Sequence, residues 1–343
     1  MADQKNNLYV DNIAIVGKKA APAPDNVKLY GVVLAWGCAA FYIFVMQVIV
    51  PGYREGFELF GQILTRSAPS PYAYRVLVPV LIKALAAPLS GRLEPQSAFL
   101  AGYCVYCFAA IEFSTVTLFR MLRLWFDEIS ALLGILMFCF MFAVAARHEH
   151  FQPWSLVETG FYAGAIIWGV RGSGGWAVML TVAAALNRET GLFVPLLFCA
   201  TLPGDWFDRK RNVYLAALVG VWLVVFYGLR LIIGPRPSIE TLAECLHANL
   251  LPISIALSLA ASAAFFSISL PAALGWQRVP RQIRRCTVVL LLYVPLMFVY
   301  GRWWEVRHWL PLSCILLPFA ISGVQTIIAG PGRSLGLPGG WEG

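Results

Sequence analysis

Long, uninterrupted apolar runs constrain the fold of this chain more than any other feature. Several exceed the roughly 18 residues that mark a membrane-spanning helix. They are continuous, whereas the strands of a membrane barrel alternate between polar and apolar residues. Hydrophobic residues make up 59% of the 343 positions and charged residues only 13%, with a mean hydropathy of +0.70. Because a soluble domain does not need so much apolar surface, the sequence predicts an all-α polytopic membrane protein.

These runs predict about ten transmembrane helices joined by polar connections. We expect the spans at 28–50, 97–119, 128–146, 156–170, 174–187, 189–202, 211–233, 251–273, 286–301 and 308–328. Residues 1–27 lack the apolar core of a signal peptide and predict a cytoplasmic N-terminal tail. The glycine-rich segment 330–343 predicts a flexible C-terminal tail. Residues 28–329 would form a single transmembrane domain.

The run RVLVPVLIKALAAPLSGR at 75–92 allows two topologies, because it is short and contains two prolines and a lysine. If it lies at the interface, the outer loops are about 51–96, 147–156, 234–250 and 301–308. If it spans, several connections change sides. The count of Lys and Arg does not decide between the two. We favour the interfacial arrangement because it gathers every unusual polar cluster on one face. The protein would then be a multi-pass protein of the plasma (inner) membrane with a cytoplasmic N-terminus.

The stretch 51–79 crowds charges between hydrophobic segments. Glu55 and Glu58 are three residues apart, so on a helix both would project from one face. A carboxylate held near lipid can have a raised pKa and serve as a general base near neutral pH. We therefore predict that Glu55 and Glu58 are catalytic. The alternative is two ordinary acids on a solvated loop.

His148 and His150 follow the span at 128–146, and Glu158 lies shortly after them. Two histidines and a carboxylate can hold a divalent metal, but histidines one residue apart face the same way only on an extended chain. Hydrogen bonding to a phosphate or a sugar, and a plain interfacial loop, are the other interpretations. A divalent metal therefore stays open as a cofactor, and no metal ligand is assigned.

Asn187, Arg188 and Glu189 interrupt an otherwise apolar stretch from Trp176 to Leu202. Polar residues there are unfavourable unless they line an aqueous or substrate-filled cavity. Arg188 could grip a phosphate. The alternative is a pair between Arg188 and Glu189 that closes a helical hairpin.

Arg302, Glu305 and Arg307 belong to the densest charged cluster, GRWWEVRHW at 301–309. Tryptophans are frequent at membrane interfaces, so an interfacial anchor is one interpretation. Two guanidinium groups near the headgroup level are also suited to bind a diphosphate or a phosphodiester. The cluster is therefore a candidate phosphate-binding site.

The order of these elements resembles the GT-C superfamily, membrane glycosyltransferases that take sugars from polyprenyl-phosphate or related carriers. In that fold one span leads to an outer loop with an essential acid, then to juxtamembrane helices, two spans and a second outer loop. This chain offers, in the same order, span 28–50, the loop with Glu55 and Glu58, the run after Arg75, spans 97–119 and 128–146, and the loop from His148 to Glu158.

Two short motifs extend the resemblance, which covers residues 28–210. The stretch SPYAYRVLVPVL at 70–81 is similar to the Ser-Pro-Tyr, Tyr-Arg and Pro-Leu-Leu pattern of the mannosyltransferase of GPI-anchor synthesis. The short helices joined by NRET at 187–190 look like the hairpin that follows in many members. Members mostly carry aspartate in the first outer loop, where this chain has glutamate.

The resemblance implies inverting transfer of one sugar, hexosyl or pentosyl, from a lipid-phosphate donor to an acceptor on the extracytoplasmic face. The implied set is Glu55 or Glu58 as base, Arg75, Arg188, Arg302 and Arg307 on the carrier phosphate, and His148, His150, Glu158 and Glu305 near the sugar, with Asn187 and Glu189 in the binding site. The expected partners are the lipid-linked donor and membrane lipids. No basic stripe with interleaved aromatics predicts nucleic-acid binding, and the sequence does not indicate an oligomeric state.

Two other functions are compatible with the same clusters. In a transporter or lipid flippase, the polar groups would line a translocation path, although the repeated halves common in transporters are not found in the sequence. In a non-catalytic membrane assembly subunit, they would bind a partner protein.

Overall fold

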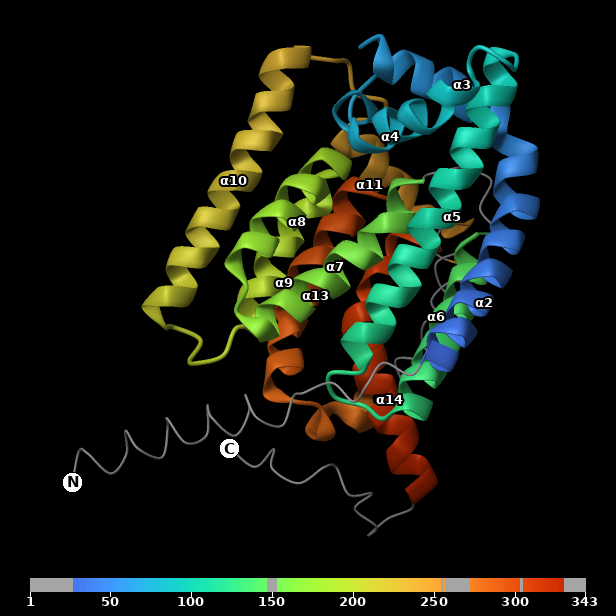
Figure 1. The fold of residues 1–343 in the computed structure, drawn as a ribbon. Helices are drawn as coiled ribbons and strands as arrows, with labels where there is room; N and C mark the ends of the chain where they lie inside the picture. The colour runs from blue at the N-terminus through green and yellow to red at the C-terminus, as the bar shows by residue number, and fades with distance from the viewer. Residues whose placement is uncertain (1–26, 147–152, 254–255, 257–271, 303–304, 330–343) are drawn as a thin grey trace, which may run out of the picture.

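The computed structural model describes residues 27–146, 153–253, 256, 272–302 and 305–329. Within these ranges the chain is all-α and contains no strand, and its helices pack into one bundle (Figure 1). Six of the described helices are long and apolar enough to cross a membrane. The expected all-α, membrane-like class is therefore confirmed. The expected tails lie outside the described residues, except for Val27.

The six candidate spans account for most of the length of the bundle. They are Val27–Leu64, which comprises α2 (Val27–Phe44), a π-helical segment (Val45–Ile49) and α3 (Val50–Leu64), then α5 (Pro95–Leu122), α6 (Glu128–Ala145), α10 (Arg209–Ile233), α13 (Arg281–Tyr300) and Leu310–Ile328, which includes most of α14 (Ser313–Ala329). In each of them the apolar stretch is long enough for the roughly 30 Å of a hydrocarbon core.

The expected count of about ten spans is not confirmed. The helices α8 (Gly174–Asn187) and α9 (Phe193–Thr201) are only 14 and 9 residues long. At about 1.5 Å per residue they reach about 21 and 14 Å, less than a bilayer core. The helix α7 (Trp154–Arg171) is buried on nearly all sides and carries a glutamate. Most of the expected span 251–273 lies outside the described residues.

The first long helix bends at its middle. The π-helical segment Val45–Ile49 precedes Pro51, which has no N–H to donate to the carbonyl of Gln47. As a result α2 runs along the bundle, whereas α3 lies across one end of it (Figure 1). Phe60 and Ile63 of α3 are buried, and the opposite face is polar. The helix α3 therefore has the form of an interfacial amphipathic helix.

The run at 75–92 forms α4 (Leu77–Ala86) followed by a short 3-10 turn (Ala87–Leu89). Ten helical residues extend about 15 Å, too little to cross a bilayer. Figure 1 places α4 beside α3 at the same end of the bundle. This geometry agrees with the interfacial arrangement and not with the spanning one.

The connection after α10 is fastened to the loop before α4. The N–H of Ser70 donates to the carbonyl of Pro237 at 2.9 Å, and the N–H of Ile239 donates to the carbonyl of Ser70 at 3.1 Å. The helix α11 (Leu242–Leu250) then starts with a capping box formed by Thr241 and Glu244. The loop before α4 and the connection after α10, which are far apart in the sequence, therefore lie together over this end of the bundle.

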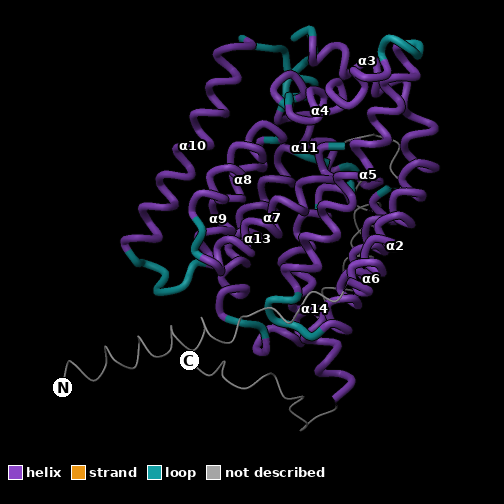
Figure 2. Tube along the Cα trace, viewed as in Figure 1, coloured by secondary structure: helices purple, strands orange, loops and turns teal. Residues whose placement is uncertain are grey.

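The connections gather at two ends of the bundle (Figure 2). The segments 65–76 and 234–241, with residues 301–302 and 305–309, lie at the end that carries α3 and α4, and the junction at 187–190 lies beneath α4 (Figure 1). The connections 123–127, 172–173, 202–208 and 279–280 lie at the opposite end, where α2 begins. Apart from the residues that are not described, the unusual polar clusters therefore share one side.

We expect Arg92→Cys and Phe207→Cys to react with a membrane-impermeant maleimide from opposite sides of sealed vesicles. Arg92 is exposed beside α4, and Phe207, with 86% of its surface exposed, lies at the other end. Cys38, an exposed native thiol, is replaced by serine in the parent for this experiment. Labelling of both positions from one side would contradict the orientation of the helices.

Candidate functional site

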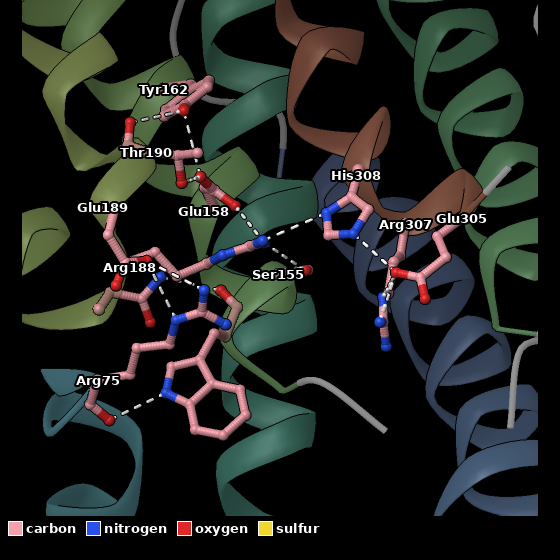
Figure 3. Close-up of polar contacts among 12 residues, drawn as sticks. Arg75, Ser155, Glu158, Tyr162, Arg188, Glu189, Thr190, Glu305, Arg307 and His308 are labelled. Carbon is pink, nitrogen blue, oxygen red and sulfur yellow. Dashed lines mark hydrogen bonds and ion pairs between the residues drawn. The ribbon is translucent and has the colours of Figure 1, made fainter. Parts of the chain in front are cut away.

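A network of polar side chains lies where five separate segments meet: α7, the hairpin formed by α8 and the 3-10 helix η4 (Glu189–Leu192), the loop before α4 and the turn before α14 (Figure 3), and the last turn of α10. We call it the arginine–glutamate network. Its members are Arg75, Ser155, Glu158, Tyr162, Arg188, Glu189, Thr190, Glu305, Arg307 and His308, together with Arg230 of α10. Most of these side chains are buried. Six of these members are predicted binding residues. A seventh, Asn187, joins them through Trp154, because its amide donates to the carbonyl of Trp154 and the ring N–H of Trp154 donates to the carbonyl of Arg75. The members that the sequence did not predict are Ser155, Tyr162, Thr190, Arg230 and His308.

The centre of the network is a buried ion pair between Glu158 and Arg188, whose exposed fractions are 1% and 4%. Arg188 Nη1 donates to Glu158 Oε2 at 3.1 Å and to Ser155 Oγ at 3.0 Å. Glu158 Oε1 accepts from Tyr162 at 3.2 Å and from the hydroxyl of Thr190. Both carboxylate oxygens are therefore engaged, so Glu158 joins α7 to the hairpin and is not free to act as a base.

The expected alternative, a pair between Arg188 and its neighbour Glu189, is wrong. The backbone at Arg188 is extended, with φ −158° and ψ 161°. In an extended chain successive side chains point to opposite sides. Arg188 therefore reaches Glu158 on α7, whereas Glu189 reaches Arg75.

His308 extends the network on the other side of Arg188. Arg188 Nη2 lies 3.2 Å from His308 Nδ1. Because a guanidinium only donates, Nδ1 must accept, and the ring proton sits on Nε2, which donates to Glu305 at 2.7 Å. Burial lowers the pKa of His308 to about 4, although Glu305 opposes this shift. His308 is therefore neutral near pH 7, and its contact with Glu305 is a hydrogen bond and not an ion pair.

Glu305 is paired with Arg307 in the same turn. Arg307 Nη2 and Nε donate to Glu305 Oε2 at 2.6 and 3.1 Å. Burial by itself raises the pKa of Glu305, but the hydrogen bonds from His308 and Arg307 hold it well below its usual range. The carbonyl of His308 accepts from Tyr293 of α13 at 2.6 Å, which fixes the turn. Glu305 Oε1 takes no hydrogen bond from a described residue.

Glu189 lies between two arginines from different segments. Arg75 donates to Glu189 Oε2 from Nη2 at 3.0 Å and from Nε at 3.2 Å. Arg230, in the last turn of α10, has Nη2 3.9 Å from Glu189 Oε1. Burial raises the pKa of Glu189, yet Arg75 and Arg188 lower it overall. The carboxylate therefore stays ionised in this part of the bundle.

Aromatic rings fix the two arginines that hold Glu189. The carbonyl of Arg75 accepts from Trp154 Nε1 at 3.1 Å, and its guanidinium lies 5.2 Å from the ring centre of Tyr72. The guanidinium of Arg230 lies 4.3 Å from the ring centre of Tyr74. The sequence reasoning missed Arg230 because it looks like an ordinary charged end of an apolar span. The available signal was a lone cation at the C-terminal end of that span.

The network carries an excess of positive charge. The four arginines Arg75, Arg188, Arg230 and Arg307 face three glutamates, which leaves a net charge of 4 − 3 = +1 with His308 neutral. Arg188 Nε is buried without a hydrogen-bond partner among the described residues. A buried donor without an acceptor is unfavourable by about 1–3 kcal/mol. The arrangement is therefore suited to bind an anion.

Other predicted site residues lie apart from the network. Glu55 and Glu58 are exposed on α3 and form no hydrogen bond or ion pair with a described residue. Arg302 pairs with Glu240 before α11. Their proposed roles stay predictions, as do those of His148 and His150, which lie outside the described residues. Among the described residues, no group of three His, Cys, Asp or Glu side chains could hold a metal.

We expect Glu158→Gln and Arg188→Met each to lower the free energy of unfolding by about 3 kcal/mol, because each leaves one buried charge without its partner. The double variant should lose at least about 1 kcal/mol less than the sum of the single losses. Unfolding in detergent measures these values. The exposed control Glu58→Gln should change stability by less than about 0.5 kcal/mol, and additive losses would contradict a direct pair.

We expect acid to destabilise the protein through His308. The folded pKa of about 4 lies below the unfolded value of about 6.5, so the unfolded chain binds more protons between these limits. Stability is thus fully present above about pH 6.5 and falls as the pH drops toward 4. His308→Gln keeps a donor for Glu305 and should reduce this dependence in melting curves. The control His247→Gln on α11 should keep the wild-type dependence, and an unchanged curve for His308→Gln would contradict the neutral buried state.

Comparisons with known proteins identify no relative of this chain. No protein-family model, no curated protein and no solved structure matches the chain. The function is therefore argued from the arrangement of its own side chains.

Proposed function

We propose that this protein is an integral membrane glycosyltransferase that moves one sugar from a lipid-phosphate-linked donor to an acceptor. The observation that carries the proposal is the convergence of four arginines on three glutamates beneath α4, with one positive charge in excess. Charged groups inside a membrane-like bundle are unfavourable unless they serve binding or catalysis. Guanidinium groups match the geometry and the charge of phosphate oxygens. The expected ligand is therefore a lipid-linked phosphate.

The position of the network supports a lipid carrier. The helices α3 and α4 lie across the same end of the bundle, so a headgroup could enter beneath them while the carrier tail stays in the bilayer. Basic connections gather at the opposite end, where positive charge favours the cytoplasmic side. On this basis the reaction would take place at the extracytoplasmic face of the plasma membrane, with the N-terminus inside.

The proposed chemistry is a single displacement with inversion. The acceptor oxygen forms a bond to the anomeric carbon while the bond from that carbon to the phosphate oxygen breaks. The electron pair leaves with the phosphate, which the arginines stabilise. The acceptor proton passes to a carboxylate, for which Glu55 is our first choice and Glu58 the second. The low pKa of Glu305 makes it a weak base, better suited to orient the acceptor hydroxyl through Oε1.

A lipid flippase is the second candidate, and one observation favours it. Each of the three glutamates in the network already accepts from an arginine, so the described residues of the network include no unpaired carboxylate. A path that admits a phosphate headgroup and moves it across the bilayer needs cations but no base. The two candidates therefore differ in the need for a carboxylate that takes a proton.

We expect the purified protein to transfer sugar from labelled polyprenyl-phosphate sugars. Arg75→Lys keeps the charge but loses the two-donor contact, and should lower kcat/KM at least about 100-fold. The exposed control Arg54→Gln on α3 should leave transfer unchanged. Melting curves check that both variants fold.

The acids are tested in the same assay. Glu55→Gln or Glu58→Gln should lower kcat, and unchanged transfer in both variants removes the proposed base. Absence of transfer by the parent protein, together with movement of the labelled lipid between leaflets, would decide for the flippase.

A further inference from the structure

A second concentration of positive charge lies at the end of the bundle opposite α3 and α4, where α10 and α13 begin (Figure 1). The segments 204–211 and 277–285 carry seven cations, namely Arg209, Lys210, Arg211, Arg278, Arg281, Arg284 and Arg285. Within these two segments only Asp205 and Asp208 oppose them, which gives a net charge of 7 − 2 = +5. Neither aspartate forms an ion pair with a described residue. The two aspartates therefore do not neutralise this positive charge through ion pairs with described residues.

The turn before α10 holds two guanidinium groups close together. The carbonyl of Gly204 accepts from Arg285 Nη1 at 2.8 Å and from Arg211 Nη2 at 3.1 Å. The ring of Trp206 lies over both groups, at 5.6 Å from Arg211 and 5.8 Å from Arg285. Two like charges thus share one carbonyl oxygen, an arrangement that an anion would stabilise.

Arg211 carries unfilled hydrogen-bond donors near this turn. Only 4% of its surface is exposed, and its Nε and Nη1 are buried without a hydrogen-bond partner among the described residues. The third nitrogen of its guanidinium group, Nη2, donates to the carbonyls of Leu202 and Gly204. Unfilled donors on a buried cation are unfavourable, so acceptor oxygens at this turn would stabilise it.

A shallow, open cavity of about 680 Å³ lies beside this turn at the start of α10. Its lining residues are Asp208, Arg209, Lys210, Val213 and Tyr214. The first turn of a long helix also presents backbone N–H groups and the positive end of the helix dipole. The cavity therefore has a cationic rim and space for a headgroup.

An apolar stripe leads from the cavity along α10. Val213 lines the cavity, and Val224 and Leu231 lie 11 and 18 residues further on, which at 3.6 residues per turn places all three on one face. All three are exposed, as is Phe207 at the rim. This stripe offers apolar surface to an acyl chain whose headgroup sits in the cavity.

We propose that this end of the bundle binds the phosphate of an anionic phospholipid. Arg209 and Lys210 hold the headgroup at the start of α10, Arg211 supplies donors beneath Trp206, and the acyl chains follow the stripe from Val213. Because the apolar stripe can contact acyl chains, the proposed ligand is a lipid and not free phosphate. The site is separate from the arginine–glutamate network and does not depend on the proposed transferase activity.

The whole protein in detergent tests this site through its melting temperature. Short-chain phosphatidylglycerol should raise the melting temperature with a saturating dose response. Phosphatidylcholine of the same chain length and inorganic phosphate, at equal concentration, should not. Equal stabilisation by inorganic phosphate would overturn the lipid source, and equal stabilisation by phosphatidylcholine would overturn the selection for negative charge.

Variants locate the site. Arg209→Gln and Lys210→Gln should each weaken the affinity for phosphatidylglycerol about fivefold, the effect of about 1 kcal/mol per cation near an anionic headgroup. The matched control Arg120→Gln removes one exposed charge at the same end, on α5, and should change the affinity less than about twofold. An equal loss in all three variants would show general surface attraction and overturn the site.

Arg211→Lys tests the buried donors separately, because it keeps the charge and removes Nε. It should weaken the phosphatidylglycerol affinity while Arg209 and Lys210 are intact. If this variant fails to fold, the exposed positions 209 and 210 still decide the proposal. A folded Arg211→Lys with unchanged affinity would overturn the role given to Arg211.

Discussion

The buried ion pair between Glu158 and Arg188 is the interaction on which the rest of the site depends. Both side chains are almost inaccessible, and either charge alone would be strongly destabilising there. The pair joins α7 to the α8–η4 hairpin, and Arg188 continues to His308 in the turn before α14. A single guanidinium therefore connects the middle of the chain with the turn before α14.

The hairpin explains why so many charges lie inside the bundle. Because α8 and α9 are short, their junction at 187–190 ends below α4, where most polar side chains are buried. Other side chains of the protein satisfy them there. Arg75 reaches Glu189 from the loop before α4, and Trp154 holds the backbone of Arg75 in place. Because the first helix bends and α4 is short, α3 and α4 lie over the network at this end of the bundle.

The two ends of the bundle carry positive charge in different forms. In the network each glutamate is paired with an arginine. The other N–H groups of these guanidinium groups therefore point in defined directions, which suits the binding of one anion in one orientation. At the start of α10 and α13 the cations outnumber the acids and border an open cavity with an apolar stripe. That form suits the headgroups of a membrane leaflet. The two proposals therefore concern different anions.

The sequence by itself determined the all-α membrane class and most of the polar segments that meet in the site. It could do so because charges within apolar runs are unfavourable and stand out. It did not determine the number of spans, since α8 and α9 are apolar but too short to cross. Only the tertiary structure decided that Arg188 pairs with Glu158, thirty residues away, and that Arg230 joins Glu189. The extended backbone at Arg188 turns neighbouring side chains apart, and no spacing in the sequence records that conformation.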